Sequence, residues 1–263
     1  MSSYAVAMAN EDAPERTERR DQWAAKIAAW GEQGRTGRSG KAPLTVGRIV
    51  DAAFGLIETE GFEALTMRRV AAALQTGPAS LYAHVRNKAE LDGLLISELC
   101  ARVPVPEPDP ARWREQMLGI CRALRDEYLR YPGVSRAALA TAPDSLDALR
   151  LSEGMLTILL AAGVPPQSAA WAIDAAFLYV SAYCFEVSLR YRPGSGADQR
   201  VLDRDDLVER YRMLPGDVFP NTVAHIQELT SGEKHERFEF TLTALLGGLV
   251  PPGPPHTAPA TAD

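Results

Sequence analysis

A run of alternating prolines divides this chain into two regions. Residues 103–110 read Val-Pro-Val-Pro-Glu-Pro-Asp-Pro. A helix cannot continue through such a segment, because proline lacks the backbone N–H and its ring clashes with the preceding turn. Apolar residues recur at helical spacing on both sides of the run. The sequence therefore predicts an all-α protein, with a small helical region before the prolines and a larger one after them.

Around this break the sequence predicts four segments. Residues 1–43 lack a sustained apolar face and are expected to be a flexible N-terminal extension. Its Gly/Ser-rich end carries Arg35, Arg38 and Lys41, so it is either a solvated tether or an arm that follows DNA phosphates or enters the minor groove. Residues 44–102 form the first helical domain and residues 111–250 the second. The Pro, Thr and Ala-rich residues 251–263 are expected to be a disordered tail.

The distribution of charge keeps nucleic-acid binding open. The net charge of −6 argues against it, because binding to a phosphate backbone relies on excess Lys and Arg. Residues 1–102 carry 13 basic and 13 acidic side chains, whereas the remaining 161 residues carry 15 and 21. The deficit therefore belongs to the second region, and the first can still present a local basic patch.

Residues 44–86 show a start and a stop for each of three short helices. Thr45 is placed to cap the first, and Gly61 to end it in a left-handed conformation. Thr66 caps the second, which residues 75–77 interrupt. Pro78 then opens a third helix that runs to about residue 84. This order of short helix, turn and short helix is the helix-turn-helix layout.

The outer face of the third helix suits a DNA groove. Leu81 and Val85 are expected to anchor this helix, with the small side chains of Ala79, Ser80 and Ala83 outside. Polar side chains that can reach phosphates follow at Tyr82, His84, Arg86 and Lys88. Asn87 begins a fourth helix with Glu90 at its third position, as in a capping box.

Two strings in this region resemble the DNA-binding domain of the tetracycline-repressor (TetR) family. They are residues 65–71 (LTMRRVA) and 78–91 (PASLYAHVRNKAEL), and the Leu-Tyr-x-His-Val-x-Asn-Lys run is the most specific part. The second region is similar to the C-terminal domain of the tetracycline-repressor subgroup in its helix lengths and long late loop. The resemblance implies a helix-turn-helix domain followed by a ligand-binding and dimerisation domain. It also implies a repressor that binds palindromic operator DNA as a homodimer and is released by a small-molecule inducer.

The resemblance also implies roles for individual residues. Thr66 would hold a phosphate and Arg68 would contact a guanine through two hydrogen bonds. Base edges would be met by Pro78, Ala79 and Ser80, and phosphates by Tyr82, His84 and Lys88. Ala83 stands where tetracycline repressors carry a large aromatic residue, so we expect a different operator. The residues alone leave an alternative open at two positions. Tyr82 could be half buried in the core, and His84 could be a cation at the end of its helix.

The second region predicts several long helices. The helical spacing covers residues 113–128, 146–162 and 167–191, and after a polar excursion residues 219–230 and 236–249. Residues 167–191 are apolar nearly all round, so we expect them to lie between their own domain and a partner subunit. The four-helix dimer interface that the resemblance implies would use residues 167–191 and 238–249.

An apolar inducer pocket is expected in this region. Its candidate lining residues are Trp113, Tyr128, Phe177, Tyr179, Tyr183 and Glu186, for which ordinary core packing is the alternative. The drug–magnesium site of the tetracycline-repressor subgroup uses a histidine that residues 134–143 lack. Glu186 alone is a weak magnesium ligand. We therefore expect a metal-free inducer and no cofactor.

Other classes of protein fit less well. The sequence shows no Ser/His/Asp order, no glycine-rich phosphate loop and no paired carboxylates, so we expect no enzyme. A DNA-binding regulator controlled by protein partners, or one with no ligand, stays as the alternative. Cys100, Cys121 and Cys184 lie in apolar helical patterns and are expected to be reduced core thiols. We expect no apolar run of membrane-spanning length, no signal peptide and a cytoplasmic location.

Overall fold

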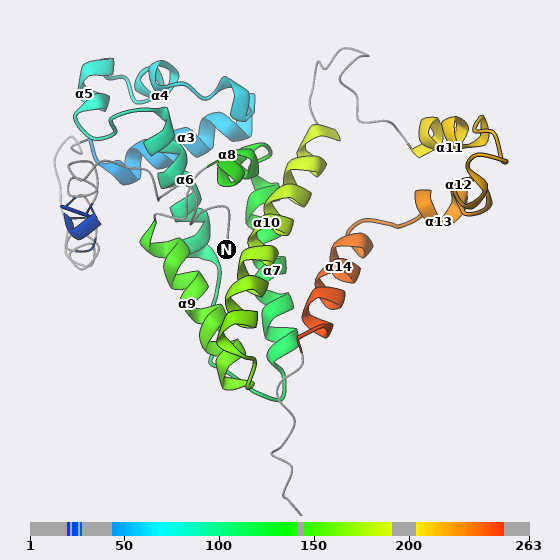
Figure 1. Ribbon diagram of the computed structural model, residues 1–263. Helices are drawn as coiled ribbons and strands as arrows, with labels where there is room; N and C mark the ends of the chain where they lie inside the picture. Colours follow the sequence, from blue (N-terminus) through cyan, green and yellow to red (C-terminus); the bar gives the residue numbers. More distant parts are fainter. Residues whose placement is uncertain are drawn as a thin grey trace, which may run out of the picture. The chain divides into compact units, whose positions relative to one another are not determined.

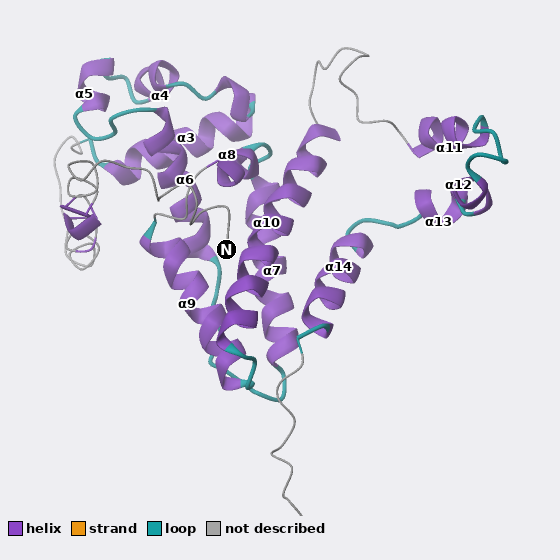
Figure 2. Cartoon of the chain, viewed as in Figure 1, coloured by secondary structure: helices purple, strands orange, loops and turns teal. Residues whose placement is uncertain are grey.

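The computed structural model describes residues 20, 21, 23–25, 27, 44–140, 145–190 and 204–249, and every regular element in those ranges is a helix (Figures 1 and 2). The all-α prediction is therefore confirmed. The chain divides into two compact units, residues 1–43 and 44–263. The predictions for Arg35, Arg38 and Lys41 and for residues 251–263 fall outside the described residues.

The second unit begins with short helices whose predicted caps form. They are α3 (Val46–Glu60), the 3-10 turn η2 (Phe62–Ala64), α4 (Met67–Ala73), α5 (Pro78–Tyr82) and α6 (Lys88–Arg102). Backbone N–H groups donate to the capping side chains of Thr45 (3.3 Å), Thr66 (3.2 Å) and Asn87 (2.8 Å). Gly61 ends α3 with φ 84°. α5 ends two residues before the predicted end at residue 84.

Longer helices follow the proline run. They are α7 (Trp113–Arg130), α8 (Val134–Ala140), α9 (Leu146–Ala161), α10 (Pro166–Arg190) and, near the end, α14 (Glu236–Gly247). α10 packs against each of the other four, and α7 lies along it (Figure 1). Gly163, with φ 79°, and Pro165 end α9 as the sequence predicts. α7 and α10 are thus the central pair of this region.

Between α10 and α14 lie three short helices: α11 (Arg204–Arg212), α12 (Pro220–Ala224) and α13 (Ile226–Thr230), which pack on one another. The single helical stretch predicted for residues 219–230 is wrong in this detail. His225 has φ −117° and ψ 31°, outside the helical region, and separates α12 from α13.

One hydrophobic core runs from α3 to α14. Its largest fully buried side chains are Ile49, Ile57, Leu81, Leu91, Leu95, Leu99, Met117, Ile120, Leu124, Leu151, Met155 and Phe238. The proline run belongs to this core, since Val103 is buried and Val105 packs against Gly154 of α9. A Cβ at Gly154 would overlap with Cγ1 of Val105. The proline run therefore interrupts the helices but not the hydrophobic core.

α10 is apolar nearly all round but is not covered on all sides. Trp171 is 58% exposed and Leu178 is 51% exposed. The expectation that no apolar run reaches membrane-spanning length is wrong: by length and composition alone, the helix of residues 166–189 is long and apolar enough to cross a membrane. The finding is weak evidence for a membrane, because the core helix of a soluble protein passes the same test. The three cysteines are free and buried, as predicted.

Candidate nucleic-acid interface

Two short helices, α4 and α5, carry the candidate interface. Val70 and Ala71 bury the inner side of α4, and Leu81 and Val85 are 0% exposed and hold α5 and the turn after it on the core. α5 has only five residues and no side chain caps it. Its position therefore depends on these apolar anchors, as the sequence predicts.

The turn between the helices uses an unexpected residue. Gln75 adopts φ 53°, a left-handed conformation that L-residues rarely take. The N–H of Thr76 donates to the carbonyl of Ala71 (3.0 Å), which closes the end of α4. Gly77, by contrast, has φ −74° and ψ 149° and is the residue that precedes α5. The reversal therefore falls on Gln75 rather than on the glycine.

The outer side of α5 is open to solvent, as the DNA-binding prediction requires. Pro78, Ala79 and Ser80 are exposed. Tyr82 is 49% exposed, and His84 is also exposed, just after the end of α5. Tyr82 therefore belongs to the surface rather than to the core, and the predicted base-facing and phosphate-facing groups lie on one short stretch of chain.

Two neighbouring arginines on α4 differ in their partners. Arg69 forms an ion pair with Glu60 at the end of α3. Arg68 is exposed and forms no ion pair with any residue in the described ranges. Thr66 accepts the Arg69 N–H as helix cap, which leaves its hydroxyl proton free to donate. Arg68 is thus the α4 cation that is available to DNA.

Lys88 and Arg86 are held by carboxylates of α6. The Lys88 ammonium pairs with Asp92 and lies 4.4 Å from the ring centroid of Phe62. Burial raises the pKa of Asp92, although Lys88 lowers it. The Arg86 Nε donates to Glu90 (3.1 Å). A phosphate would have to share these cations. Sequence reasoning missed Asp92, although its i,i+4 spacing from Lys88 is typical of a helical ion pair.

The interface connects to the larger region at the start of α8. Gly133 has φ 96°, and a Cβ there would lie 2.8 Å from Cβ of Phe62. One turn further on, the Arg136 guanidinium donates to Glu63 (2.7 Å). The ring that lies under Lys88 is therefore also the ring that touches Gly133. No pattern in the sequence links these residues.

An aromatic stack adds a second connection. The rings of Phe54 on α3 and Tyr131 just after α7 are 4.3 Å apart. The Arg102 guanidinium lies 4.9 Å from the Phe54 centroid and donates to the Tyr131 hydroxyl (3.2 Å). Three helices that come from both sides of the proline run thus meet at one contact.

The candidate pocket residues do not form one group. Trp113 and Tyr128 are buried on α7, but fifteen residues separate them, about 22 Å along a helix. Tyr179 and Tyr183 on α10 pack around Phe238 of α14, with centroids 5.8 and 5.0 Å from it.

The remaining two candidates are also on α10. Phe177 is partly buried against the core. Glu186 is paired with Arg237 of α14 (2.5 Å), so its carboxylate is engaged between two helices. Of the six candidate pocket residues, the structure therefore brings together three. Tyr179 and Tyr183 contact Phe238 of α14, and Glu186 pairs with Arg237 of the same helix.

A helix-turn-helix with an exposed recognition face, built on a larger helical region, defines a DNA-binding transcriptional regulator. The family model described as "Bacterial regulatory proteins, tetR family" matches residues 49–91, and the one described as "Tetracyclin repressor-like, C-terminal domain" matches residues 105–251. The chain therefore belongs to the TetR family.

Individual relatives agree with this assignment. The HTH-type transcriptional repressor DrrR1 of Streptomyces coeruleorubidus is 30% identical, over 84% of this chain and 82% of its own length. Apo ActR from Streptomyces coelicolor has a TM-score of 0.71 and 37% identity, over 80% of this chain and 96% of its own. The complex of Streptomyces coelicolor ActR with actinorhodin has a TM-score of 0.71 and 38% identity, over 79% of this chain and 96% of its own. The family resemblance seen in the sequence is confirmed.

Proposed function

We propose that this protein is a repressor that binds a palindromic operator as a homodimer and releases it when a small molecule binds its larger helical region. The observation that carries the DNA-binding part is the exposed α4–α5 face, with Arg68 unpaired among the described residues. One helix-turn-helix contacts few base pairs, so useful affinity requires two half-sites about 34 to 36 Å apart. A two-fold dimer supplies them. Such a regulator works in the cytoplasm.

Exposed apolar faces on α10 and α14 support the homodimer. Trp171 and Leu178 are exposed on α10, and Phe240 on α14 is 75% exposed. Thr243 and Ala244 share the Phe240 face, and as small residues they allow a second helix to approach closely. Adjacent apolar faces of this kind mark an interface. Because α10 and α14 pack on each other, two copies would form a four-helix contact.

A bilayer suits the α10 face less well than a second protein copy does. Asp174 is exposed between Trp171 and Leu178 on the same helical face. A carboxylate that faces lipid is costly, whereas at a protein interface it can reach a polar group or water. We therefore assign this face to the dimer.

Two observations support a ligand. ActR, similar to this chain over most of both lengths, has been solved with actinorhodin bound. In this chain the hydroxyl of Ser135 on α8 is buried and has no hydrogen-bond partner among the described residues. A bound molecule could satisfy it. A ligand that prefers one position of α8 would act on the DNA-binding helices through Gly133 and Arg136, which contact Phe62 and Glu63.

Control by a protein partner is the second candidate. Met213 (76% exposed), Val218 (62%) and Leu229 (54%) present apolar surface on and around α11–α13. If no compound in a thermal-shift screen stabilises the protein or releases its DNA, this candidate replaces the small-molecule inducer.

Substitutions in the interface test the DNA-binding part. Arg68→Ala should relax sequence preference, because a guanine contact is worth about 1 to 3 kcal/mol of discrimination. Lys88→Ala should weaken all sequences similarly and reduce the salt slope by about one. Arg69→Ala is the matched control, since Arg69 is the next residue on α4, pairs with Glu60 and has no DNA contact assigned to it. Equal loss of specificity in all three variants would refute the assigned roles.

Sedimentation tests the dimer. Phe240→Glu places a charge on the exposed face of α14 and should convert the protein to monomers with weakened operator binding. Met213→Glu, on an equally exposed apolar residue, should leave the dimer intact. A wild-type protein that sediments as a monomer at micromolar concentration would exclude the proposed homodimer.

A further inference from the structure

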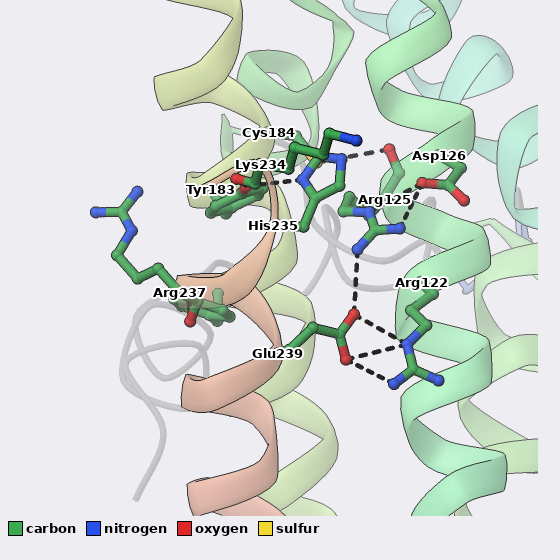
Figure 3. A network of polar contacts seen from close by, with 10 residues as sticks. Arg122, Arg125, Asp126, Tyr183, Cys184, Lys234, His235, Arg237 and Glu239 are labelled. Atoms are coloured by element: carbon green, nitrogen blue, oxygen red, sulfur yellow. Dashed lines mark hydrogen bonds and ion pairs between the residues drawn. The ribbon is translucent and has the colours of Figure 1, made fainter. Parts of the chain in front are cut away.

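A network of charged side chains joins α14 to α7 (Figure 3). Glu239 of α14 accepts from Arg122 at both carboxylate oxygens, with distances of 2.6 to 3.0 Å. It also accepts from Arg125 (3.4 Å). The two guanidinium groups hold the pKa of Glu239 below its usual value, mainly through the Arg122 hydrogen bond. Glu239 is therefore ionised at neutral pH and fixes α14 to α7.

The segment that leads into α14 is fixed to α10 by a histidine. The Tyr183 hydroxyl lies 2.9 Å from Nδ1 of His235 and 3.3 Å from the carbonyl of Lys234. Lys234 has φ 45°, so the chain turns sharply just before His235. The Tyr183 ring also contacts Phe238 in the first turn of α14. His235 thus stands where the helix begins to dock.

His235 faces a buried cation. The Arg125 side chain is 8% exposed and its guanidinium lies 4.7 Å from the ring centroid of Phe238. The charged groups around His235 are Arg125 and Asp126 from α7 and Lys234 and Glu239 from its own segment, with the Tyr183 hydroxyl from α10. Burial, and then Arg125, lower the pKa of His235. The docked imidazole is therefore harder to protonate than a solvated one.

We propose that His235 is an acid-sensitive latch: its protonation loosens the docking of α14 on α7 and α10. A protonated ring would add a second positive charge beside Arg125, which cannot lose its own. The repulsion is relieved when residues 234–247 move away from α7, because the imidazolium is then hydrated.

The hydrogen bonds do not oppose this switch. Tyr183 has one hydroxyl proton and two acceptors, Nδ1 of His235 and the carbonyl of Lys234. When Nδ1 is protonated it donates to the Tyr183 oxygen, and the hydroxyl then donates to the carbonyl. The cost of protonation therefore comes from burial, Arg125 and Lys234, and the carboxylates of Asp126 and Glu239 offset part of it.

The linkage between proton binding and α14 docking sets the direction and the upper limit of the pH effect. A detached His235 takes up its proton near pH 6.5, whereas the docked residue does so only at lower pH. Docking is therefore favoured above pH 6.5 and weakens as the pH falls from 6.5 through the docked value. One titrating group changes the equilibrium at most tenfold per pH unit.

Hydrogen exchange of the full-length protein tests the latch. We expect the protection factors of the α14 amides, corrected for the intrinsic exchange rate, to fall severalfold between pH 7.5 and 5.5, and no more than about tenfold between 6.5 and 5.5. His235→Phe keeps a ring against Tyr183 but cannot take up a proton, so its protection should not change with pH. His225→Phe is the matched control, since that side chain is 62% exposed, and should behave as wild type.

A third variant keeps the test informative if His235→Phe does not fold. Lys234→Asn removes one cation that faces His235, and asparagine tolerates the left-handed backbone. The fall in protection should then be smaller. A wild-type protein with constant protection, or a fall of equal size in His235→Phe or Lys234→Asn, would overturn the proposal.

The consequence for DNA binding rests on the proposed function, in which α14 belongs to the dimer interface. If so, acid should also raise the dimer dissociation constant. Sedimentation at the same two pH values separates the proposals: a monomer at both pH values refutes the dimer and leaves the exchange result as the test of the latch.

Discussion

Replacement of Gly133 by alanine tests the contact between the start of α8 and the DNA-binding helices. Gly133 has φ 96°, where an L-residue is strained by about 1 to 3 kcal/mol. The new Cβ would also lie 2.8 Å from the Cβ of Phe62, which is tethered to the backbone and cannot swing aside. Overpacking of this kind costs about 1 to 3 kcal/mol. We therefore expect Gly133→Ala to lower the free energy of unfolding by about 2 to 6 kcal/mol.

Gly61→Ala separates the two contributions. Gly61 also has a positive φ, 84°, but nothing lies within 4 Å of the position of its missing Cβ. Gly61→Ala should therefore lower the free energy of unfolding only by the backbone strain, about 1 to 3 kcal/mol. Urea denaturation at equal protein concentration, followed by circular dichroism, gives both values. The difference between the variants should be about 1 to 3 kcal/mol, and equal destabilisation would refute the tight contact.

The same variant has an expected effect on DNA. Phe62 lies under the Lys88 ammonium, so a displaced ring should move this side chain, to which we assign a phosphate contact. We expect Gly133→Ala to weaken operator binding more than Gly61→Ala does, in a fluorescence anisotropy titration at a temperature where both are folded.

Three further predictions concern packing and charge. Gly154→Ala should destabilise the protein by about 1 to 3 kcal/mol because its Cβ would meet Val105, whereas Gly119→Ala on α7, with open space, should stabilise it by up to about 1 kcal/mol; thermal unfolding of both variants decides. Burial raises the pKa of all three thiols to about 12, so a thiol reagent at pH 8 should label none in the native protein and three in urea; labelling of the native protein would show that a thiol is exposed. Because the pKa of Glu239 is lowered in the folded protein, its ion pairs stabilise the fold fully at pH values above its usual pKa of 4.5. This stabilisation is lost as the pH falls through the lowered pKa. The gap in Tm between wild type and Glu239→Gln should therefore narrow below pH 4.5, and a gap independent of pH would contradict the ion pairs.

Local rules were sufficient for the helix ends near the DNA-binding face. Thr45, Thr66 and Asn87 each cap the helix that follows, because a cap is formed by residues within one turn. The anchors Leu81 and Val85 were also predicted, because helical spacing assigns the buried side directly. Where the physical cause lies within a few residues, the sequence is sufficient.

Long-range contacts were not predicted. The partners of Gly133 and Glu239 lie far away in the chain, and no spacing rule connects them. Trp171 and Leu178 of α10 are exposed in the single chain, and the partner subunit that was expected to cover this helix stays a prediction. The break at His225 has no local signal of the kind that Gly and Pro supply.

The most direct test of a ligand-released repressor is a salt-dependent gel shift on the DNA that flanks its own gene. We expect retardation that weakens steeply with salt, is weakened in Arg68→Ala at the specific site more than at other sequences, and is reversed by a compound that raises the Tm of the protein. Absence of retardation at low salt, with folded protein and DNA that spans both flanks, would contradict the repressor assignment.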